Sequence, residues 1–308
     1  MNAMTPTRLS NNALAQLVGD AAVAKRRARI VGGVAAARGH DYEQLFIAHR
    51  VARLLMKFET TGTDATVEWQ SAEFIDDVVV RRDSALCVKA YQLKNTAEVS
   101  WTANQNTITE DFQLQATVSA IEGYTRTRLR LVCSDRDRAT RLNNGVPATI
   151  AAQTKAIFFP YHEKVQKVIE GHAWMRDDFA LLSRHADPSL VDCVDVASVL
   201  AGAWSVLKPT AAVSAVFQQA RRTSPTILRP FVPGADPAAR LRPEVRVILD
   251  GLPGFKYDIV RGFLKWSLDA GNTSGTLKID CFDPDFDALQ DQIVQRTPAT
   301  FEEIEELL

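Results

Sequence analysis

Carboxylate, amide and ammonium side chains stand near the ends of two neighbouring apolar segments. Asp76 and Asp77 precede the apolar residues 78–80, and Gln92 and Lys94 end the next apolar run. Side chains alternate across a strand, so Gln92 and Lys94 share one face. Carboxylate and amide oxygens suit Mg²⁺, with Mn²⁺ as the alternative ion. A bound metal activates water, and a nearby lysine stabilises developing negative charge.

The segment between the two runs determines which acid faces the amide. Arg82-Asp83-Ser84-Ala85 is short enough for a hairpin, and a loop at Ser84-Ala85 places Asp77 directly opposite Gln92. A shift of one residue would place Asp76 there, so Asp76 is the alternative metal ligand. In either register an acid reaches the Gln92/Lys94 pair. A structural salt bridge across the hairpin is the competing interpretation, because buried charges need partners.

The spacing of apolar residues predicts the elements that carry these side chains. A helix over 41–58, with Asp41 as its N-cap, brings Glu43 toward the strands as a further acid. Glu73 is either an auxiliary ligand or a solvent-facing residue. The remaining elements are strands at 66–70, 74–81 and 86–94, a helix at 109–122, and strands at 128–134 and 155–159.

This order of elements, with D…QxK on the second and third strands, resembles the PD-(D/E)xK restriction-endonuclease-like fold. Gln in place of the last acid is similar to the Mrr-type branch, and Gly39-His40-Asp41-Tyr42-Glu43 resembles the start of that branch's helix. Gln92-Leu93-Lys94-Asn95-Thr96 with Trp101-Thr102 resembles the double-stranded-DNA endonuclease domain of bacterial anti-phage effectors, including those of CBASS-type systems. The resemblance covers about residues 39–160.

The resemblance implies a role for each of these residues. Asp77 and Gln92 would be metal ligands, Lys94 the catalytic lysine and Glu43 the helix acid. The implied function is Mg²⁺-dependent cleavage of duplex DNA with low sequence specificity, switched on by a partner or signal. Two alternatives stay open: a non-catalytic DNA-binding scaffold of a multi-protein defence complex, and an RNase on the same fold.

The chain of 308 residues is long enough for roughly two domains. We expect a flexible basic arm over 1–30 and an α/β nuclease-like domain over 31–160. A mainly α-helical domain over 161–308 would serve oligomerisation, partner binding or sensing. Its predicted helices are 161–186, 188–207, 209–222 and 243–269, with a late strand at 276–282 and an acidic helix at 301–308.

The total charge and the distribution of charge differ in what they predict about nucleic-acid binding. Hydrophobic residues make up 46% and charged residues 24%, as in soluble globular proteins. The net charge of -1 argues against DNA binding through global charge. Basic residues are nevertheless clustered, and we expect two clusters to contact DNA phosphates. They are Lys25, Arg26 and Arg27 in the arm, and Arg126, Arg128, Arg136, Arg138 and Arg141 around the fourth strand.

The cysteines and the apolar segments indicate the compartment. Cys87, Cys133, Cys193 and Cys281 are far apart and lack the spacing of a zinc site. They are typical of reduced core cysteines in a cytoplasmic protein. Uninterrupted apolar runs fall short of the roughly 18 residues that cross a bilayer. We therefore expect a cytoplasmic protein without a membrane association.

Overall fold

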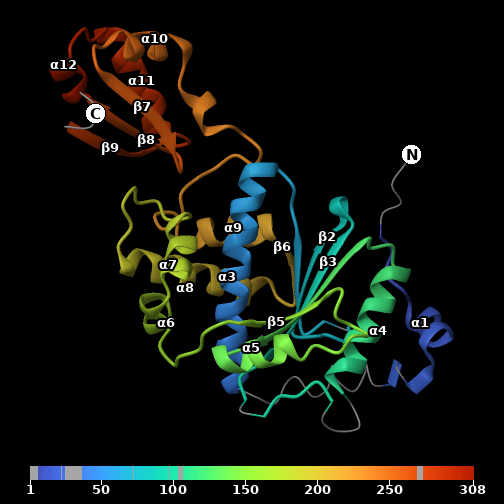
Figure 1. Cartoon of the computed structure of the whole chain (residues 1–308). Helices are drawn as coiled ribbons and strands as arrows, with labels where there is room; N and C mark the ends of the chain where they lie inside the picture. The colour runs from blue at the N-terminus through green and yellow to red at the C-terminus, as the bar shows by residue number, and fades with distance from the viewer. Residues whose placement is uncertain are drawn as a thin grey trace.

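The computed structural model of the chain describes residues 6–21, 23–24, 37–71, 73–96, 98–102, 107–268 and 273–308. These residues form a larger unit around a six-stranded sheet and a smaller unit around a three-stranded sheet (Figure 1). Helices accompany both sheets, in agreement with the α/β class expected from the sequence.

The larger sheet is mixed, and its strand order is β5-β4-β3-β2-β1-β6. Its first three strands form an antiparallel meander, and β4 and β5 continue parallel to β3. Strand β6 pairs antiparallel with β1 at the other edge. The strands are β1 (Thr66–Trp69), β2 (Val78–Arg82), β3 (Cys87–Lys94), β4 (Arg126–Cys133), β5 (Thr154–Phe158) and β6 (Thr210–Ala212).

Alternating apolar residues give the sheet two buried faces. Val78 and Val80 point to the face covered by α3 (Ala37–Thr61), whereas Val79 points to the face covered by α4 (Ile108–Ile121). Helix α3 lies between the sheet and a second helical layer, and α4 lies on the far side (Figure 1). The second layer and the helix after β4 comprise α8 (Leu190–Leu207), α9 (Val213–Thr223) and α5 (Arg136–Asn144).

The structure corrects three local predictions. Helix α3 begins at Ala37, so Asp41 lies inside the helix instead of capping it. Strand β2 begins at Val78, because residues 73–75 and Asp77 form bends before the ladder starts. Helix α5, capped by Asp135, was not expected from the sequence; it is short, and only Ala139 and Leu142 are buried on it.

The predicted domain boundary at residue 160 does not coincide with a structural break. Helices α6 (Val165–Gly171) and α7 (Ala173–Ala180) lead into α8, which packs against α3 in the same hydrophobic core. The chain then returns to the six-stranded sheet as β6. The larger unit therefore includes residues through Thr223 at the end of α9.

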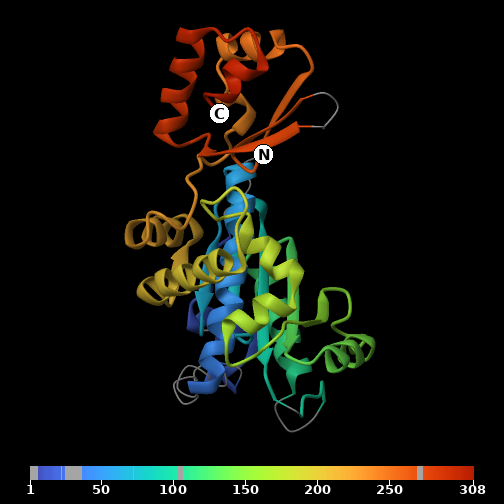
Figure 2. The same ribbon diagram turned by 90° about the vertical axis from the view of Figure 1, so that its left-hand side faces the viewer.

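Residues 161–308, predicted to form a mainly α-helical domain, are largely helical through α9, whereas the C-terminal unit combines helices with a three-stranded sheet. Helix α10 ends at Gly251, and the rest of the predicted 243–269 helix forms strands β7 (Phe255–Val260) and β8 (Phe263–Leu268). Arg261 and Gly262 join them with φ of 58° and 82°, as a two-residue type I′ turn requires. The unit, at one end of the molecule in Figure 2, also contains η3 (Pro237–Arg240), α10 (Pro243–Gly251), β9 (Thr273–Asp280), α11 (Pro284–Arg296) and α12 (Phe301–Glu305).

Part of the N-terminal segment packs against the larger unit, unlike the flexible arm expected over 1–30. Helix α1 (Asn11–Val18) buries Leu14 completely in a cluster with Phe74 and Val118. Arg8 forms an ion pair with Glu68 of β1. The basic residues Lys25, Arg26 and Arg27 lie outside the described residues.

One helix in the described part of the chain, α8, is long and apolar enough to cross a membrane. It instead packs within the larger unit, and Cys193, Leu200 and Trp204 on it are buried. The four cysteines are free and buried, as expected from their spacing.

Candidate active site

The hairpin of β2 and β3 has the register that the sequence predicts. Val78 pairs with Tyr91, so Asp77, one residue earlier, comes opposite Gln92. Gln92 Nε2 donates a hydrogen bond of 2.7 Å to Asp77 Oδ2, and the Leu93 backbone N–H donates one of 2.6 Å to the same oxygen. The connection is not a two-residue loop but a 3₁₀ turn over Asp83–Ala85. Asp77, and not Asp76, is therefore the acid that meets the amide.

Glu43 and Lys94 complete the group at this end of the sheet. Glu43 projects from the first turns of α3, and Trp69 Nε1 at the end of β1 donates a hydrogen bond of 2.6 Å to its Oε2. Lys94 is the last residue of β3. Burial raises the pKa of Asp77 and of Glu43, and the Lys94 ammonium opposes both shifts, so the three charged groups lie within electrostatic range of one another.

The environment raises the pKa of both acids. Burial raises the pKa of Asp77 to about 6; the charge of Glu43 adds to this effect, while Lys94 and the two hydrogen bonds oppose it. Burial also raises the pKa of Glu43, and the nearby Asp76 carboxylate raises it further. Asp77 keeps some exposed surface, but protein atoms surround its carboxylate. Such paired, shifted acids are common at functional sites and also occur in structural clusters.

The donor atoms present are those that a hard divalent cation prefers. Among the described residues, no three His, Cys, Asp or Glu side chains are close enough to form a metal site by themselves. The oxygen set would comprise the carboxylates of Asp77 and Glu43 and the amide of Gln92, with waters completing the shell, as Mg²⁺ allows. The amide now presents Nε2 to Asp77, so ligation through oxygen requires it to turn over.

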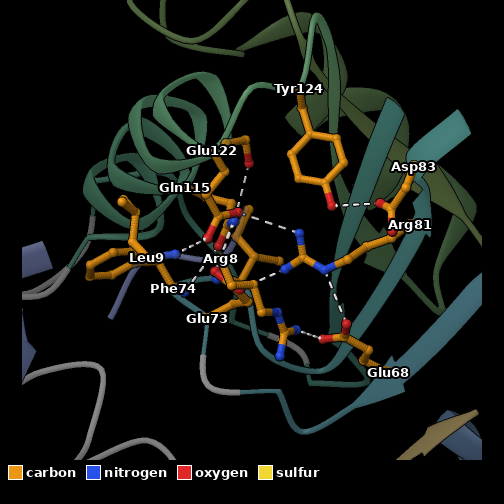
Figure 3. Close-up of polar contacts among 12 residues, drawn as sticks. Arg8, Leu9, Glu68, Glu73, Phe74, Arg81, Asp83, Gln115, Glu122 and Tyr124 are labelled. Atoms are coloured by element: carbon orange, nitrogen blue, oxygen red, sulfur yellow. Dashed lines mark hydrogen bonds and ion pairs between the residues drawn. The ribbon is translucent and has the colours of Figure 1, made fainter. Parts of the chain in front are cut away.

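A buried polar network holds the segment that carries Asp77 (Figure 3). Gln115 Oε1 on α4 accepts hydrogen bonds from the backbone N–H groups of Phe74, at 3.0 Å, and Ile75, at 3.2 Å. Its Nε2 donates to Glu73 Oε2 at 3.1 Å. Because these contacts fix residues 73–75, they also fix the approach of Asp77 to β3.

Arg81 lies at the centre of that network. Its guanidinium donates to Glu73 at 2.6 Å and Glu68 at 3.0 Å, and Glu122 lies 3.5 Å away (Figure 3). Burial by itself lowers the pKa of Arg81, but Glu73 and Glu68 raise it well above its usual value. Burial and the charge of Glu73 also raise the pKa of Glu122. The guanidinium therefore stays charged and neutralises part of a buried acidic cluster.

Glu73 thus has a structural role, and neither sequence-based interpretation of it was right. Its side chain is 1% exposed and bonded to Arg81, so it neither faces solvent nor points toward the candidate metal ligands. Local sequence patterns could not show this, because Arg81 lies on β2 and Gln115 lies on α4, both outside the segment that carries Glu73. An arginine at an inward position of β2 is the available signal, since such a residue needs buried acids.

The arginines expected around the fourth strand separate into two groups. Arg126 and Arg128 lie at the start of β4, the end of the sheet farthest from Lys94. Arg136, Arg138 and Arg141 lie on α5, directly after the end of β4 that pairs with Lys94. Only this second group is near the candidate site.

The α5 arginines adjoin the segment that follows Lys94. Arg138 donates a hydrogen bond to the Thr96 carbonyl. Arg138 and Arg141 line a cavity of about 360 Å³ with Trp101 and Thr102, and the indole N–H of Trp101 bonds to the Leu142 carbonyl at 2.8 Å. The region after Lys94 is therefore both basic and anchored to α5.

No protein-family model, curated protein or solved structure matches the chain.

Proposed function

We propose that the protein is a Mg²⁺-dependent endonuclease that cleaves duplex DNA, the function implied by its resemblance to PD-(D/E)xK nucleases. One observation carries the proposal: the hydrogen-bonded pair Asp77–Gln92 lies at the end of the sheet within electrostatic range of Glu43 and Lys94. Four residues from three segments of the chain thus form one polar group with the donor types that phosphodiester hydrolysis requires.

Each residue of this group would have its own role in catalysis. Asp77, Glu43 and Gln92 would hold Mg²⁺, and Asp76 remains the neighbouring acid on the same segment. When bound, Mg²⁺ lowers the pKa of a coordinated water and stabilises charge on the phosphate. The Lys94 ammonium would orient the attacking water and stabilise the developing negative charge. Gln115 and Glu73 would keep Asp77 in place through the buried network.

DNA would lie over α5 and the end of β3. The α5 arginines would contact its phosphates; they are Arg136, Arg138 and Arg141. Such contacts supply affinity for DNA without selecting a sequence. DNA contacts by the arm residues Lys25, Arg26 and Arg27 stay a prediction. We further propose a cytoplasmic location and an activating partner, or a second copy of the chain, bound through residues 161–308.

Plasmid nicking tests the proposal. Lys94→Ala should abolish nicking in Mg²⁺ while leaving the folded structure unchanged. Lys265→Ala is the matched control, because Lys265 is an exposed strand lysine in the C-terminal unit. The wild-type protein should also lose nicking in EDTA and recover it with added Mg²⁺. Nicking by Lys94→Ala at the wild-type rate would contradict the assignment of the site.

A non-catalytic DNA-binding scaffold is the second candidate, and one observation favours it. Asp77 Oδ2 accepts two hydrogen bonds from β3, so protein donors alone already hold this carboxylate against the neighbouring strand. A scaffold would bind duplex DNA equally well with and without EDTA and would nick nothing. Offering RNA beside DNA in the same assay separates the RNase alternative.

A further inference from the structure

A second polar site lies at the opposite end of β3 from Lys94. It is a pocket of about 400 Å³ between α3 and the strands β2, β3 and β4. Arg50, Arg53 and Lys57 line it from α3, where their spacing of three to four residues places them on one helix face. Val80 and Tyr91 form its buried floor.

Four more cations line the pocket from the sheet. Arg82, Lys89, Arg126 and Arg128 come from β2, β3 and β4, and the pairing of Lys89 with Arg128 sets two of them side by side. Seven positive side chains from four elements therefore surround one small space.

Almost none of this charge is neutralised by the described part of the protein. The one ion pair is between Arg53 Nε and Asp178 Oδ2, at 3.7 Å. Within the described residues, no carboxylate forms a salt bridge with the other six cations, and buried Arg50 Nε has no hydrogen-bond partner. His49 beside Arg50 has its pKa lowered to about 4, mainly by burial, and is therefore neutral at pH 7.

The pKa of Lys89 reflects the unfavourable proximity of these positive charges. Burial, together with the smaller effects of the Arg82, Arg128 and Arg50 charges, lowers the pKa of Lys89 to about 8. A half-buried ammonium among like charges is unfavourable unless an anion relieves the repulsion. The pocket is therefore complementary to a ligand with several negative charges.

We propose that this pocket binds a small ligand carrying adjacent phosphate groups, such as the triphosphate of a nucleotide. The volume falls in the range of small-molecule sites, and convergent arginines match phosphate oxygens in charge and geometry. The proposal goes beyond the nuclease function and does not depend on it.

The geometry favours a compact ligand over a DNA backbone. The cations converge on a concave space, whereas the phosphates of a duplex follow a long convex surface. Lys89 is also five residues from Lys94 along β3, or about 17 Å at the rise of a strand. The side chain of Lys89 shares the α3 face with Tyr91, whereas Gln92 and Lys94 alternate to the other face.

Calorimetric titration of the full chain, without divalent metal, tests the proposal with inorganic triphosphate, ATP and a duplex of about 20 base pairs. We expect both triphosphate and ATP to bind in a salt-dependent manner. Arg126→Ala/Arg128→Ala should weaken binding by about tenfold or more, because two charge-assisted contacts are lost. Lys89→Gln, which removes a single charge, is the second variant and should weaken it less.

Lys256→Ala/Lys265→Ala is the matched control, because it removes two lysines from the C-terminal sheet and should leave the affinity unchanged. Equal affinities for triphosphate and ATP would identify phosphate groups alone as the ligand, and tighter ATP binding would add the nucleoside; both support the proposal. It is overturned if neither small ligand binds at about 1 mM, if the pocket variants bind like wild type, or if only the duplex depends on these residues.

Discussion

Replacing Arg81 with leucine should destabilise the larger unit severely. Arg81 is 4% exposed and is surrounded by the carboxylates of Glu68, Glu73 and Glu122 at 3.0, 2.6 and 3.5 Å. Removing the guanidinium leaves these acids buried without their main counter-charge, and Arg8 reaches only Glu68. Breaking a buried ion pair by removing one partner typically costs about 3–5 kcal/mol, and we expect a loss in that range at pH 7.

The adjacent residue provides a matched control. Arg82 is half-buried on the opposite face of β2, and its guanidinium bonds only weakly to the Cys87 sulfur, at 3.3 Å. Arg82→Leu therefore makes the same substitution without leaving buried acids unpaired. It should alter the free energy of unfolding by less than about 1 kcal/mol. Urea unfolding followed by tryptophan fluorescence and circular dichroism gives the comparison.

The pH dependence provides a stricter test. Burial and the charge of Glu73 raise the pKa of Glu122, and Arg81 opposes this shift. Arg81→Leu removes that opposition, so the native state of the variant binds more protons than its unfolded state. The stability of the variant relative to wild type should therefore recover as the pH falls from 8 toward 5. A loss equal to that of Arg82→Leu, or one that does not change with pH, would refute the electrostatic explanation.

Two further predictions concern the candidate active site. Because Asp77 has a pKa of about 6, protons should compete with metal below that pH, and the Mg²⁺ affinity measured by calorimetry should fall up to about tenfold per pH unit there; an affinity that is constant from pH 5 to 8 would argue against Asp77 as a ligand. Gln115→Leu removes the acceptor of the Phe74 and Ile75 N–H groups, so it should cost about 1–3 kcal/mol of stability and lower the maximal nicking rate of the protein that remains folded. Unchanged nicking would show that this contact does not position Asp77.

The sequence predicted the geometry of the β2–β3 hairpin because that information is local. Strand alternation and a short connection were enough to pair Asp77 with Gln92, even though the turn itself is a 3₁₀ turn. This inference required only periodicities that act over a few residues. The candidate role of Glu43 instead came from the resemblance to PD-(D/E)xK nucleases, because no local pattern places the helix beside the strands.

The features that were missed depend on contacts between distant segments. The Arg81 cluster joins β1, β2, α4 and the N-terminal segment, so no local pattern contains it. The apolar pattern of 243–269 predicts a helix where β7 and β8 form, although Phe255, Tyr257 and Ile259 alternate with polar residues and Arg261-Gly262 has the chemistry of a tight turn. The boundary at residue 160 was wrong because α8 looks like an independent helix until its packing against α3 is known.

Strand β6 affects how the protein can be made. It joins the edge of the six-stranded sheet next to β1, yet some 140 residues separate the two strands in the chain. On the ribosome, β1 to β5 emerge well before their last neighbour, so the β1 edge stays open during that interval. An unpaired edge is a template for pairing with other chains, and long-range pairing is slow. The nascent protein is therefore most exposed to misassociation before α8 and β6 have emerged, and demand for chaperones should peak at that length.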